Sequence, residues 1–572
     1  MAGASASCRA QQNSKRRRKN GPSACSQTEG TIIQYRAFLA ATLAALAIAA
    51  CGGGTQSAAG GSSATSTAVP ADVQAVFDKP FYKNGIWGLR VMDGDKVLID
   101  SNSDRHFFIG SVRKVFSVGQ LLDTVGPNHT YDTPVYRDGP VSGGVLHGNL
   151  ILVATGDLTM GGRTNPDGTV AVSNWDHNEA NSLGNAILTQ PNPLAGYLTL
   201  ARAVKAAGID RVTGDVVVDD RLFVPFYFRD EFYVRPIFVN DDVVDLTIAP
   251  GAVGSPAGVA WRPVSAALGI NNQLTTGAAG SPSTLAIKPL LPACIGAPGC
   301  SAANSGKLPA NFVPPLTGLP NLVQTVRIVQ PANYARTVFV ESLEAAGLRV
   351  DAPPVEANPV RLLPAKDSYQ TASKVAQLIG LPYDQDAKLI LKISYNIGAD
   401  TSLVLFGVAN HVDTMADALK VEQKNLATRY GIQAGDYHFI DGSGGGDSWA
   451  TSTAVTHMLQ DLAAEPTFPA FYDALPVLGV DGSLAFVKDF ESDPTLAGAA
   501  GNVHAKTGTY VAGEDGKPIL KAQALGGYIT TKSGRHLTFQ LVVNDVPITG
   551  LPDMIGVFQD QGKIAALLWR DY

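Results

Sequence analysis

Apolar and polar residues first alternate with a period of two between residues 86 and 100, around the turn at Asp93 and Gly94. The apolar members of this pattern are Leu89, Val91, Val97 and Ile99. The period then lengthens, and apolar residues recur at helical spacing between Val112 and Leu122. The sequence therefore predicts a β-hairpin followed by an amphipathic helix.

The middle of the chain, from about Gly126 to Pro364, consists mainly of short strand-like runs separated by Gly, Pro and Asn turns. Clear strand patterns cover residues 149–154, 212–218 and 243–248. Helical spacing occurs in this region at residues 198–207 and 335–346. We expect a mainly β region with few helices.

The last third returns to helical spacing and then to strands. Helices are expected at residues 373–379, 388–393, 401–409 and 553–569, and strands at 525–530 and 537–543. Since a hairpin and helix at the start are matched by helices and strands at the end, we expect one α/β (α+β) domain that is interrupted by the middle region. The expected boundaries are 72–126 and 365–572 for this domain, and 127–364 for an insertion of nested, mostly β domains.

The N-terminus differs from the rest of the chain in charge. The whole chain of 572 residues has a formal net charge of −6, whereas residues 1–50 hold seven basic residues and one acidic residue. This basic stretch precedes an apolar run at residues 37–50, which is too short to span a bilayer and is typical of a secretory signal. The run ends in Ile48, Ala49, Ala50 and Cys51, which resembles a bacterial lipobox.

We therefore expect a signal peptide at 1–50, a lipid on Cys51 that anchors the protein on the periplasmic side of the envelope, and a Gly/Ser-rich tether at 51–71. The alternative is a buried or weakly spanning helix with an ordinary cysteine. The basic run at 15–19 is the one candidate for nucleic-acid binding, but the acidic balance of the remaining chain argues against such a partner.

Cysteine usage fits an exported protein. Cys294 and Cys300 lie in a Pro/Gly-rich loop and are the only thiols left after cleavage and lipidation. Their spacing predicts a local disulfide in an oxidising compartment. A metal site is the alternative, although no further Cys or His lies nearby.

Three short motifs carry candidate chemistry. They are Ser111-Val-Arg-Lys114, Ser394-Tyr-Asn396, and Lys506-Thr507-Gly508-Thr509. On a helix, residues i and i+3 share a face, so the hydroxyl of Ser111 and the amine of Lys114 can meet. Taken singly, each motif has a structural alternative: a helix-capping serine beside a solvated lysine, a helix-ending polar turn, and a strand end that runs into a glycine turn.

Together and in this order, the motifs resemble the signature of penicillin-binding proteins and serine β-lactamases. Further segments narrow the resemblance to the class C low-molecular-weight penicillin-binding proteins, which are D-alanyl-D-alanine carboxypeptidases and endopeptidases. These segments are Gly148–Asp157, Gly214–Asp220, Val239–Pro250, Asp441–Gly444, Leu475–Leu484 and Ala505–Thr509. The resemblance covers residues 75–572 and implies an antiparallel sheet flanked by helices, with an insertion after the first motif.

The resemblance implies a catalytic role for Ser111 as nucleophile, Lys114 as base, and Ser394 with Asn396 as proton relay and substrate contact. Lys506, Thr507, Gly508 and Thr509 are the implied binding residues for the substrate carboxylate and oxyanion. Lys506 is also the expected cation that lowers the pKa of Lys114. The implied substrates are peptidoglycan stem peptides, with β-lactams as covalent inhibitors and with no metal or organic cofactor.

Some positions depart from the family pattern or stay open. Gly110 stands where alanine is commoner, Tyr395 replaces Asp or Asn, and Gly445 and Gly446 follow Ser443 and Gly444 in place of Leu-Ser. His504 and Asp441 are expected to have supporting and turn roles. The alternative functions are a β-lactamase or esterase on the same scaffold, and a non-catalytic muropeptide-binding envelope lipoprotein.

Overall fold

The computed structural model describes residues 68–514 and 517–572. The expected signal peptide, the lipidation site Cys51 and most of the tether lie outside the described residues. In the part of the chain that is described, no helix combines the length and the apolar character needed to cross a membrane.

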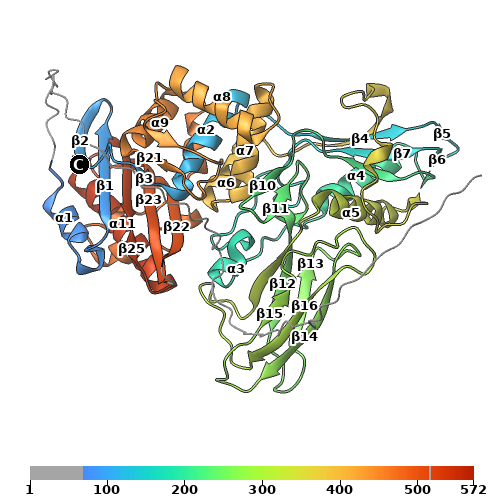
Figure 1. Ribbon diagram of the computed structural model, residues 1–572, viewed down its shortest axis with the longest axis horizontal. Helices are drawn as coiled ribbons and strands as arrows, with labels where there is room; N and C mark the ends of the chain where they lie inside the picture. Colours follow the sequence, from blue (N-terminus) through green and yellow to red (C-terminus); the bar gives the residue numbers. More distant parts are fainter. Residues whose placement is uncertain (1–67, 515–516) are drawn as a thin grey trace, which may run out of the picture. The chain divides into compact units, whose positions relative to one another are not determined.

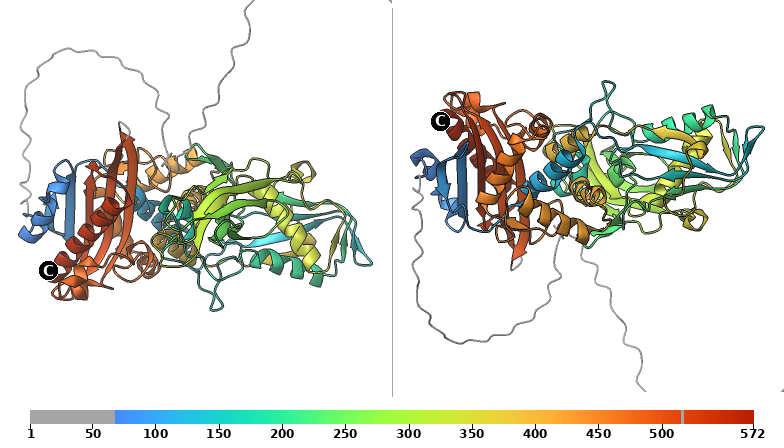
Figure 2. Two further views of the ribbon diagram at one scale, coloured as in Figure 1. Left: turned by 90° about the horizontal axis from the view of Figure 1, so that it is seen from below. Right: turned by 90° about the horizontal axis from the view of Figure 1, so that it is seen from above.

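A central antiparallel sheet joins the two ends of the described chain (Figure 1). The strand order is β2-β1-β24-β23-β22, with β25 paired to β23. The strands are β1 (Ile86–Asp93), β2 (Lys96–Ser101), β22 (Val503–Glu514), β23 (Lys517–Thr530), β24 (His536–Asn544) and β25 (Val546–Pro547). Leu89 of β1 lies opposite Leu541 of β24, and Figure 2 shows the N-terminal hairpin (blue) beside the C-terminal strands (red). The prediction that the hairpin and the last strands belong to one domain fits this pairing.

Helices cover both faces of this sheet. Because successive strand residues point to opposite faces, Ala524 and Val542 belong to one core while Leu525 and Val543 belong to another. Helices α1 (Ala71–Phe77) and α11 (Leu551–Asp571) pack in the second core. The first core contains α2 (Lys114–Val125), α6 (Tyr383–Lys392), α7 (Asn396–Ala409), α8 (Met415–Thr428), α9 (Ser452–Ala464) and α10 (Phe468–Ala474).

The region between α2 and α6 folds around a separate apolar core that also includes helices α4 (Ala195–Ala206) and α5 (Pro331–Ala345). One of its sheets has the order β19-β4-β7-β9, from β19 (Lys374–Leu378), β4 (Thr133–Asp138), β7 (Asn149–Val153) and β9 (Val216–Asp219). A second has the order β18-β8-β6-β5, from β18 (Arg349–Val350), β8 (Arg211–Val212), β6 (Val145–Leu146) and β5 (Val141–Ser142). This region is mainly β, as the turn-rich pattern predicts.

Two further sheets and a hairpin complete the region. The sheets are β13-β12-β17, from β12 (Val243–Ala249), β13 (Gly258–Arg262) and β17 (Leu322–Arg327), and β14-β16-β15, from β14 (Gly269–Gly277), β15 (Ala286–Lys288) and β16 (Ser301–Pro309). The hairpin consists of β10 (Phe226–Phe228) and β11 (Phe232–Val234). Cys294 and Cys300 form the predicted disulfide in the loop before β16.

Two sequence-based assignments are wrong in detail. Residues 373–379 do not form a helix, because β19 occupies residues 374–378 and pairs with β4. Ala376 and Leu378 are the buried residues of this strand, a spacing of two that a short apolar run does not distinguish from helical spacing. The predicted strand at 212–218 is two strands, because the chain breaks at Gly214, where a Cβ would lie 2.5 Å from the carbonyl oxygen of Gly148.

Candidate active site

The first motif lies on a tight turn that leads into α2. Residues Gly110–Arg113 form a 3₁₀ helix, η2, so Ser111 precedes the α-helix that was expected to begin with it, and Lys114 is the first residue of α2. Side chains at i and i+3 eclipse one another in a 3₁₀ helix. Lys114 Nζ therefore lies 2.7 Å from Ser111 Oγ, and the expected pair meets by a different local geometry.

Glycines allow strand β22 to lie against this turn. Gly110 has φ +48°, and a Cβ there would lie 2.7 Å from the backbone nitrogen of Thr509. A Cβ on Gly508 would lie 2.0 Å from the carbonyl oxygen of Ile109. The glycine at position 110 therefore has a steric reason, and the predicted close backbone approach at Gly508 is present.

The second motif connects α6 to α7. Ser394 lies in the connection with φ +62°, in the left-handed region, and Asn396 begins α7, five residues before the helix start expected at Thr401. Asn396 Oδ1 accepts a hydrogen bond from Lys114 Nζ at 2.7 Å, and Lys506 Nζ donates to Ser394 Oγ at 3.0 Å. The three motifs thus converge through two lysine side chains. Tyr395 is buried, so its ring packs in the core.

The third motif places hydroxyl groups beside the buried lysine. Lys506 Nζ also donates to the carbonyl oxygen of Thr507 at 2.8 Å. The hydroxyl groups of Thr507 and Ser483 lie 2.7 Å apart, and Thr509 Oγ1 donates to Gln523 at 2.9 Å. This edge of β22 therefore offers hydroxyl groups next to Lys506, a suitable surface for a carboxylate.

Burial controls the protonation of both lysines. Burial, and then the guanidinium of Arg229, lower the pKa of Lys114 to about 7. The carboxylates of Asp400, Asp441 and Glu179 act in the opposite direction and raise it. Burial first, and then the charge on Lys114, holds the pKa of Lys506 well below its ordinary value. Arg229 is thus a cation acting on Lys114 that the sequence did not indicate, and the expected repulsion between Lys506 and Lys114 is expressed in the lowered pKa of Lys506.

Two charged residues from the inserted region reach this site. Arg229 lies at the tip of the β10–β11 hairpin, and Glu179 Oε1 accepts a hydrogen bond from Asn396 Nδ2 at 3.1 Å. Sequence reasoning missed both, since neither lies in a motif and each reaches the site only through the fold of the insertion. The sequence offered no local signal for Glu179, and only a turn-like Arg-Asp pair for Arg229.

A buried ion pair supports the loop opposite Lys114. Arg113 Nη2 lies 2.6 Å from the carboxylate of Glu422, and Arg113 Nε donates to the carbonyl oxygen of Asp441 at 2.9 Å. The same loop carries Ser443, whose carbonyl oxygen accepts from Lys114 Nζ at 2.9 Å. Arg113, the third residue of the first motif, therefore helps to position an acceptor for Lys114.

The two additional candidates have the supporting roles expected of them. Asp441 accepts hydrogen bonds from the backbone nitrogens of Ser443, Gly444 and Gly445, which makes it the turn residue of its loop. The His504 ring stacks on Tyr472 with centroids 3.9 Å apart, and Nδ1 lies 3.2 Å from the Tyr472 carbonyl oxygen. Burial lowers the pKa of His504, which favours a neutral ring.

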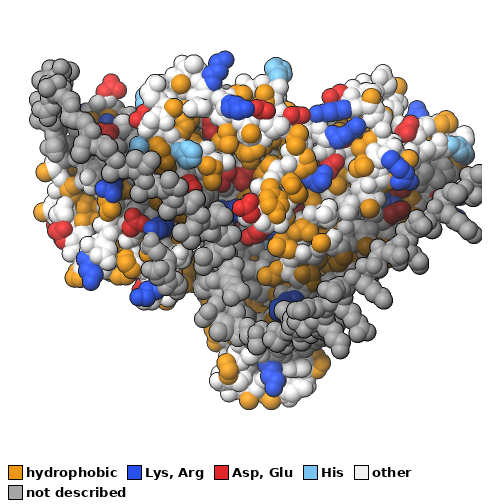
Figure 3. All heavy atoms as spheres, in the orientation of Figure 1, with side chains coloured by type: hydrophobic (Ala, Val, Ile, Leu, Met, Phe, Trp, Pro, Cys, Tyr) orange, Lys and Arg blue, Asp and Glu red, His pale blue; other side chains and the backbone are white. Residues whose placement is uncertain are grey.

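Asp176, His177 and Asp241 bring atoms that could hold a metal ion within 4.8 Å of one another. Arg163 already donates to Asp176 at 2.8 Å and to Asp241, however. A guanidinium therefore lies where a metal ion would have to bind. We assign the cluster a structural role. On the face drawn in Figure 3, Lys and Arg side chains are scattered and do not form one basic patch.

The fold and the convergent motifs define a class of serine peptidase, and comparisons identify its family. Residues 69–555 match the model of the D-Ala-D-Ala carboxypeptidase 3 (S13) family. The chain belongs to this family, and its activity is that of a D-Ala-D-Ala carboxypeptidase, which confirms the predicted family and activity.

Individual relatives agree with this assignment. A D-alanyl-D-alanine carboxypeptidase from Actinomadura sp. strain R39 is 25% identical over 526 residues, which cover 86% of this chain and 84% of that protein. Penicillin binding protein 4 from Haemophilus influenzae has a similar fold, with a TM-score of 0.61, 17% identity, and coverage of 88% of this chain and 100% of that one. The Haemophilus protein has also been crystallised in complex with a β-lactam, with 18% identity in that comparison.

Proposed function

We propose that Ser111 is the nucleophile of a D-Ala-D-Ala carboxypeptidase acting on peptidoglycan stem peptides, and that β-lactams acylate the same hydroxyl. The observation that carries this proposal is the 2.7 Å contact between Ser111 Oγ and Lys114 Nζ, combined with the depressed pKa of Lys114. A serine hydroxyl is a weak nucleophile and needs an adjacent base. With a pKa of about 7, Lys114 is neutral in a substantial fraction of molecules at neutral pH and can accept the proton.

Acylation follows from this geometry. Ser111 Oγ attacks the carbonyl carbon of the penultimate D-alanine while its proton passes to Lys114 Nζ. The carbon–nitrogen bond then breaks, and Lys114 returns the proton through the Ser394 hydroxyl to the leaving amine of the terminal D-alanine. Lys506 Nζ donates a hydrogen bond to this hydroxyl at 3.0 Å. Water hydrolyses the ester in a second round, which regenerates Ser111 and releases the shortened peptide.

Substrate recognition uses β22 and the turn before α2. The terminal carboxylate of the substrate would lie against Lys506 and the hydroxyl groups of Thr507 and Thr509. The backbone nitrogens of Ser111 and Thr509 would receive the oxyanion, a contribution of roughly 10² to 10³ in rate per donor in acyl-transfer enzymes. The close approach of Gly508 and Gly110 supports this assignment, because it places the backbone of β22 beside the nucleophile.

A labelling experiment tests the proposal. The protein is incubated with a fluorescent penicillin, and its intact mass is measured together with D-Ala release from a pentapeptide. Wild type and the matched control Ser368→Ala should gain one adduct and release D-Ala, whereas Ser111→Ala should do neither. Adduct formation in Ser111→Ala would contradict the proposal. Rapid penicillin loss without a lasting adduct would favour the β-lactamase alternative, and wild type that does not react would favour the non-catalytic one.

We further propose the domain division expected from the sequence, in which the segments 72–126 and 365–572 form the catalytic domain around the insertion 127–364. The pairing of β19 with β4 supports extending the insertion to Leu378. A lipid anchor on Cys51 after removal of residues 1–50 remains part of the proposal. Metabolic labelling with a palmitate analogue, compared between wild type and Cys51→Ala, tests the anchor.

A further inference from the structure

Glu179 is an acidic residue from the insertion that contacts a motif residue of the catalytic site. It ends the short 3₁₀ helix η3 (His177–Glu179), and its Oε1 accepts a hydrogen bond from Asn396 Nδ2 at 3.1 Å. The other end of the same amide, Asn396 Oδ1, accepts from Lys114 Nζ at 2.7 Å. Glu179 is therefore connected to the base through one side chain.

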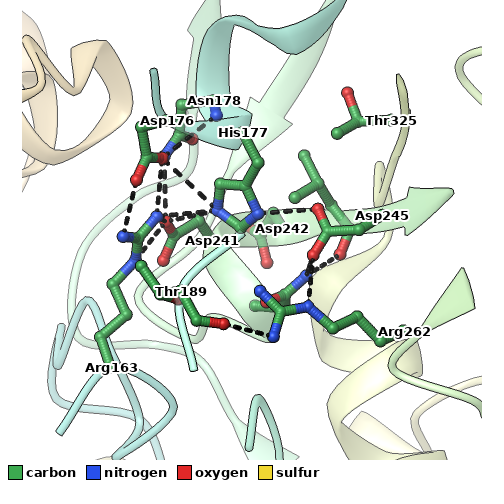
Figure 4. Close-up of polar contacts among 12 residues, drawn as sticks. Arg163, Asp176, His177, Asn178, Thr189, Asp241, Asp242, Asp245, Arg262 and Thr325 are labelled. Atoms are coloured by element: carbon green, nitrogen blue, oxygen red, sulfur yellow. Dashed lines mark hydrogen bonds and ion pairs between the residues drawn. The ribbon is translucent and has the colours of Figure 1, made fainter. Parts of the chain in front are cut away.

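A buried ionic network holds the segment that carries Glu179 (Figure 4). Arg163 makes two hydrogen bonds to the carboxylate of Asp176, at 2.8 and 2.9 Å, and donates to Asp241 at 2.8 Å through Nε. His177 Nδ1 lies 2.7 Å from Asp245, which also accepts from Arg262 Nε at 3.0 Å. These contacts fix both residues that precede Asn178 and Glu179.

The charges of this network balance when His177 is protonated. Asp176, Asp241 and Asp245 face the guanidinium groups of Arg163 and Arg262, so an imidazolium makes the group neutral. Although burial opposes it, the carboxylates of Asp245 and Asp176 raise the pKa of His177 to about 10. His177 Nε2 and Arg163 Nη2 lie 2.8 Å apart because both face the carboxylate of Asp241.

The segment is also attached to the catalytic domain. Asn174 Oδ1 accepts from the backbone nitrogen of Gly482 at 2.9 Å, and the rings of Trp175 and Phe486 lie 5.2 Å apart. Gly482 adjoins Ser483, whose hydroxyl contacts Thr507. Glu179 is thus held from two sides, by the insertion and by the wall of the site.

We propose that Glu179 is a positioning residue that fixes the amide orientation of Asn396 and so directs the lone pair of Lys114 toward Ser111. This inference rests on the proposed roles of Ser111 and Lys114. A carboxylate only accepts hydrogen bonds, so it selects the orientation in which Asn396 presents its NH₂ group to Glu179 and its oxygen to Lys114.

The orientation matters because of the hydrogen-bond count of a neutral lysine. Neutral Lys114 has two N–H groups and one lone pair, and two of its three contacts are carbonyl-type acceptors, Asn396 Oδ1 and the carbonyl oxygen of Ser443. The lone pair then faces the third contact, Ser111 Oγ. If the amide turned over, Asn396 would donate to the lone pair and compete with the serine hydroxyl.

The charge of Glu179 also acts on Lys114 directly, and this effect opposes the benefit of orienting Asn396. Its negative charge raises the pKa of Lys114, as do Asp400 and Asp441, whereas burial and Arg229 lower it. Removing the charge therefore makes the base available at lower pH, while loss of the amide orientation makes the base less effective at every pH. The two effects can be separated in a pH–rate profile.

The test measures the second-order rate of acylation by a fluorescent penicillin from pH 5 to 10. The variants are Glu179→Gln, which keeps the size of the side chain, Asn396→Ala, and the double variant. Asp167→Asn is the matched control, because it removes an exposed carboxylate from the same segment without contact to Asn396. Thermal unfolding of each variant verifies that the fold is retained.

For Glu179→Gln we expect a plateau rate about tenfold lower, from the loss of a charge-assisted hydrogen bond, and an acidic limb displaced to lower pH. The substitution should have no further effect on the plateau in the Asn396→Ala background, because Glu179 acts through that amide. A wild-type plateau in Glu179→Gln, or the same tenfold loss without Asn396, would overturn the inference. Wild type that is not acylated at all would overturn the proposed function as well.

Discussion

The candidate site has two walls of different construction. The wall from the catalytic domain is held by backbone contact: β22 lies so close to the turn before Ser111 that Gly110 and Gly508 have no room for a Cβ. The wall from the insertion contributes charges, Glu179 and Arg229, and the segment that carries Glu179 is held by buried ion pairs. The first wall places the proposed reacting atoms, and the second adds charges that shift the pKa of Lys114 beyond the effects of burial, Asp400 and Asp441.

This difference separates two kinds of sensitivity. Steric contacts between backbones depend little on pH, but a small displacement removes a catalytic geometry. Removing one charge of an ionic contact shifts the pKa values of the titratable groups near it. We therefore expect substitutions in the first wall to lower the rate without moving the pH profile. Substitutions in the second wall should move the pH profile, and Glu179→Gln should also lower the plateau because Glu179 contacts Asn396.

The largest expected effect is that of Lys114→Ala. Loss of a general base lowers rates by about 10² to 10⁴. The acylation rate should fall by this factor throughout pH 6 to 10, as measured by stopped-flow with a fluorescent penicillin. A variant that retains more than a tenth of the wild-type rate would show that another group removes the serine proton.

Gly508→Ala tests the steric wall. Its Cβ would lie 2.0 Å from the carbonyl oxygen of Ile109, so β22 must move away from the nucleophile. We expect an acylation rate about 10²-fold lower with an unchanged pH profile. Gly513→Ala is the control on the same strand, because nothing lies within 4 Å of its added Cβ. Equal rates for the two variants would exclude the steric explanation.

Arg229→Gln tests the charged wall and should have a smaller effect. The guanidinium lowers the pKa of Lys114, so its removal raises that pKa from about 7 and moves the acidic limb of the rate profile to higher pH. The rate at pH 7 should fall several-fold, while the rate at high pH approaches that of wild type. Arg202 is an exposed arginine elsewhere in the insertion, so Arg202→Gln should not change the pH of the acidic limb. A limb that moves to lower pH in Arg229→Gln would contradict the assignment.

The last prediction concerns stability and not the acylation rate. The pKa of His177 is raised from its ordinary 6.5 to about 10 in the folded protein, so protonated His177 stabilises the fold fully below about pH 6.5 and loses this effect as pH rises toward 10. Thermal unfolding between pH 6 and 10 should show a decline that is weaker in His177→Gln. The exposed His457→Gln serves as control. Identical slopes for wild type and His177→Gln would contradict the prediction.

Local patterns predicted part of the proposed catalytic domain, and they did not predict helices α8, α9 and α10. The hairpin, strand β24 and the final helix lie close to the predicted residues because each has a regular apolar period, whereas β23 begins at Lys517, eight residues before the strand expected at 525–530. The motif residues Ser111, Lys114, Asn396 and Lys506 could be singled out because their order along the chain is distinctive. The strand at 374–378 was assigned as a helix, since five residues are too few to establish a period.

The charged wall could not be predicted in the same way. Glu179 and Arg229 lie in segments without a motif, and their distance from Lys114 depends on how the insertion folds. The effect of Arg229 on the pKa of Lys114 follows from three-dimensional placement and burial. Chain order therefore singled out the proposed reacting groups, but it gave no information on the charged groups that shift the pKa of Lys114.

The separation of the site residues along the chain has a consequence for folding kinetics. Lys114 contacts Asn396 and Ser443, which are 282 and 329 residues away in sequence. Contacts between residues so far apart in sequence form slowly, after the local elements and the insertion between them have folded. A chain emerging from synthesis or export therefore has Ser111 and its proposed base, Lys114, long before it has the residues that position that base. We expect the nucleophile to stay unreactive until the last part of the chain has folded.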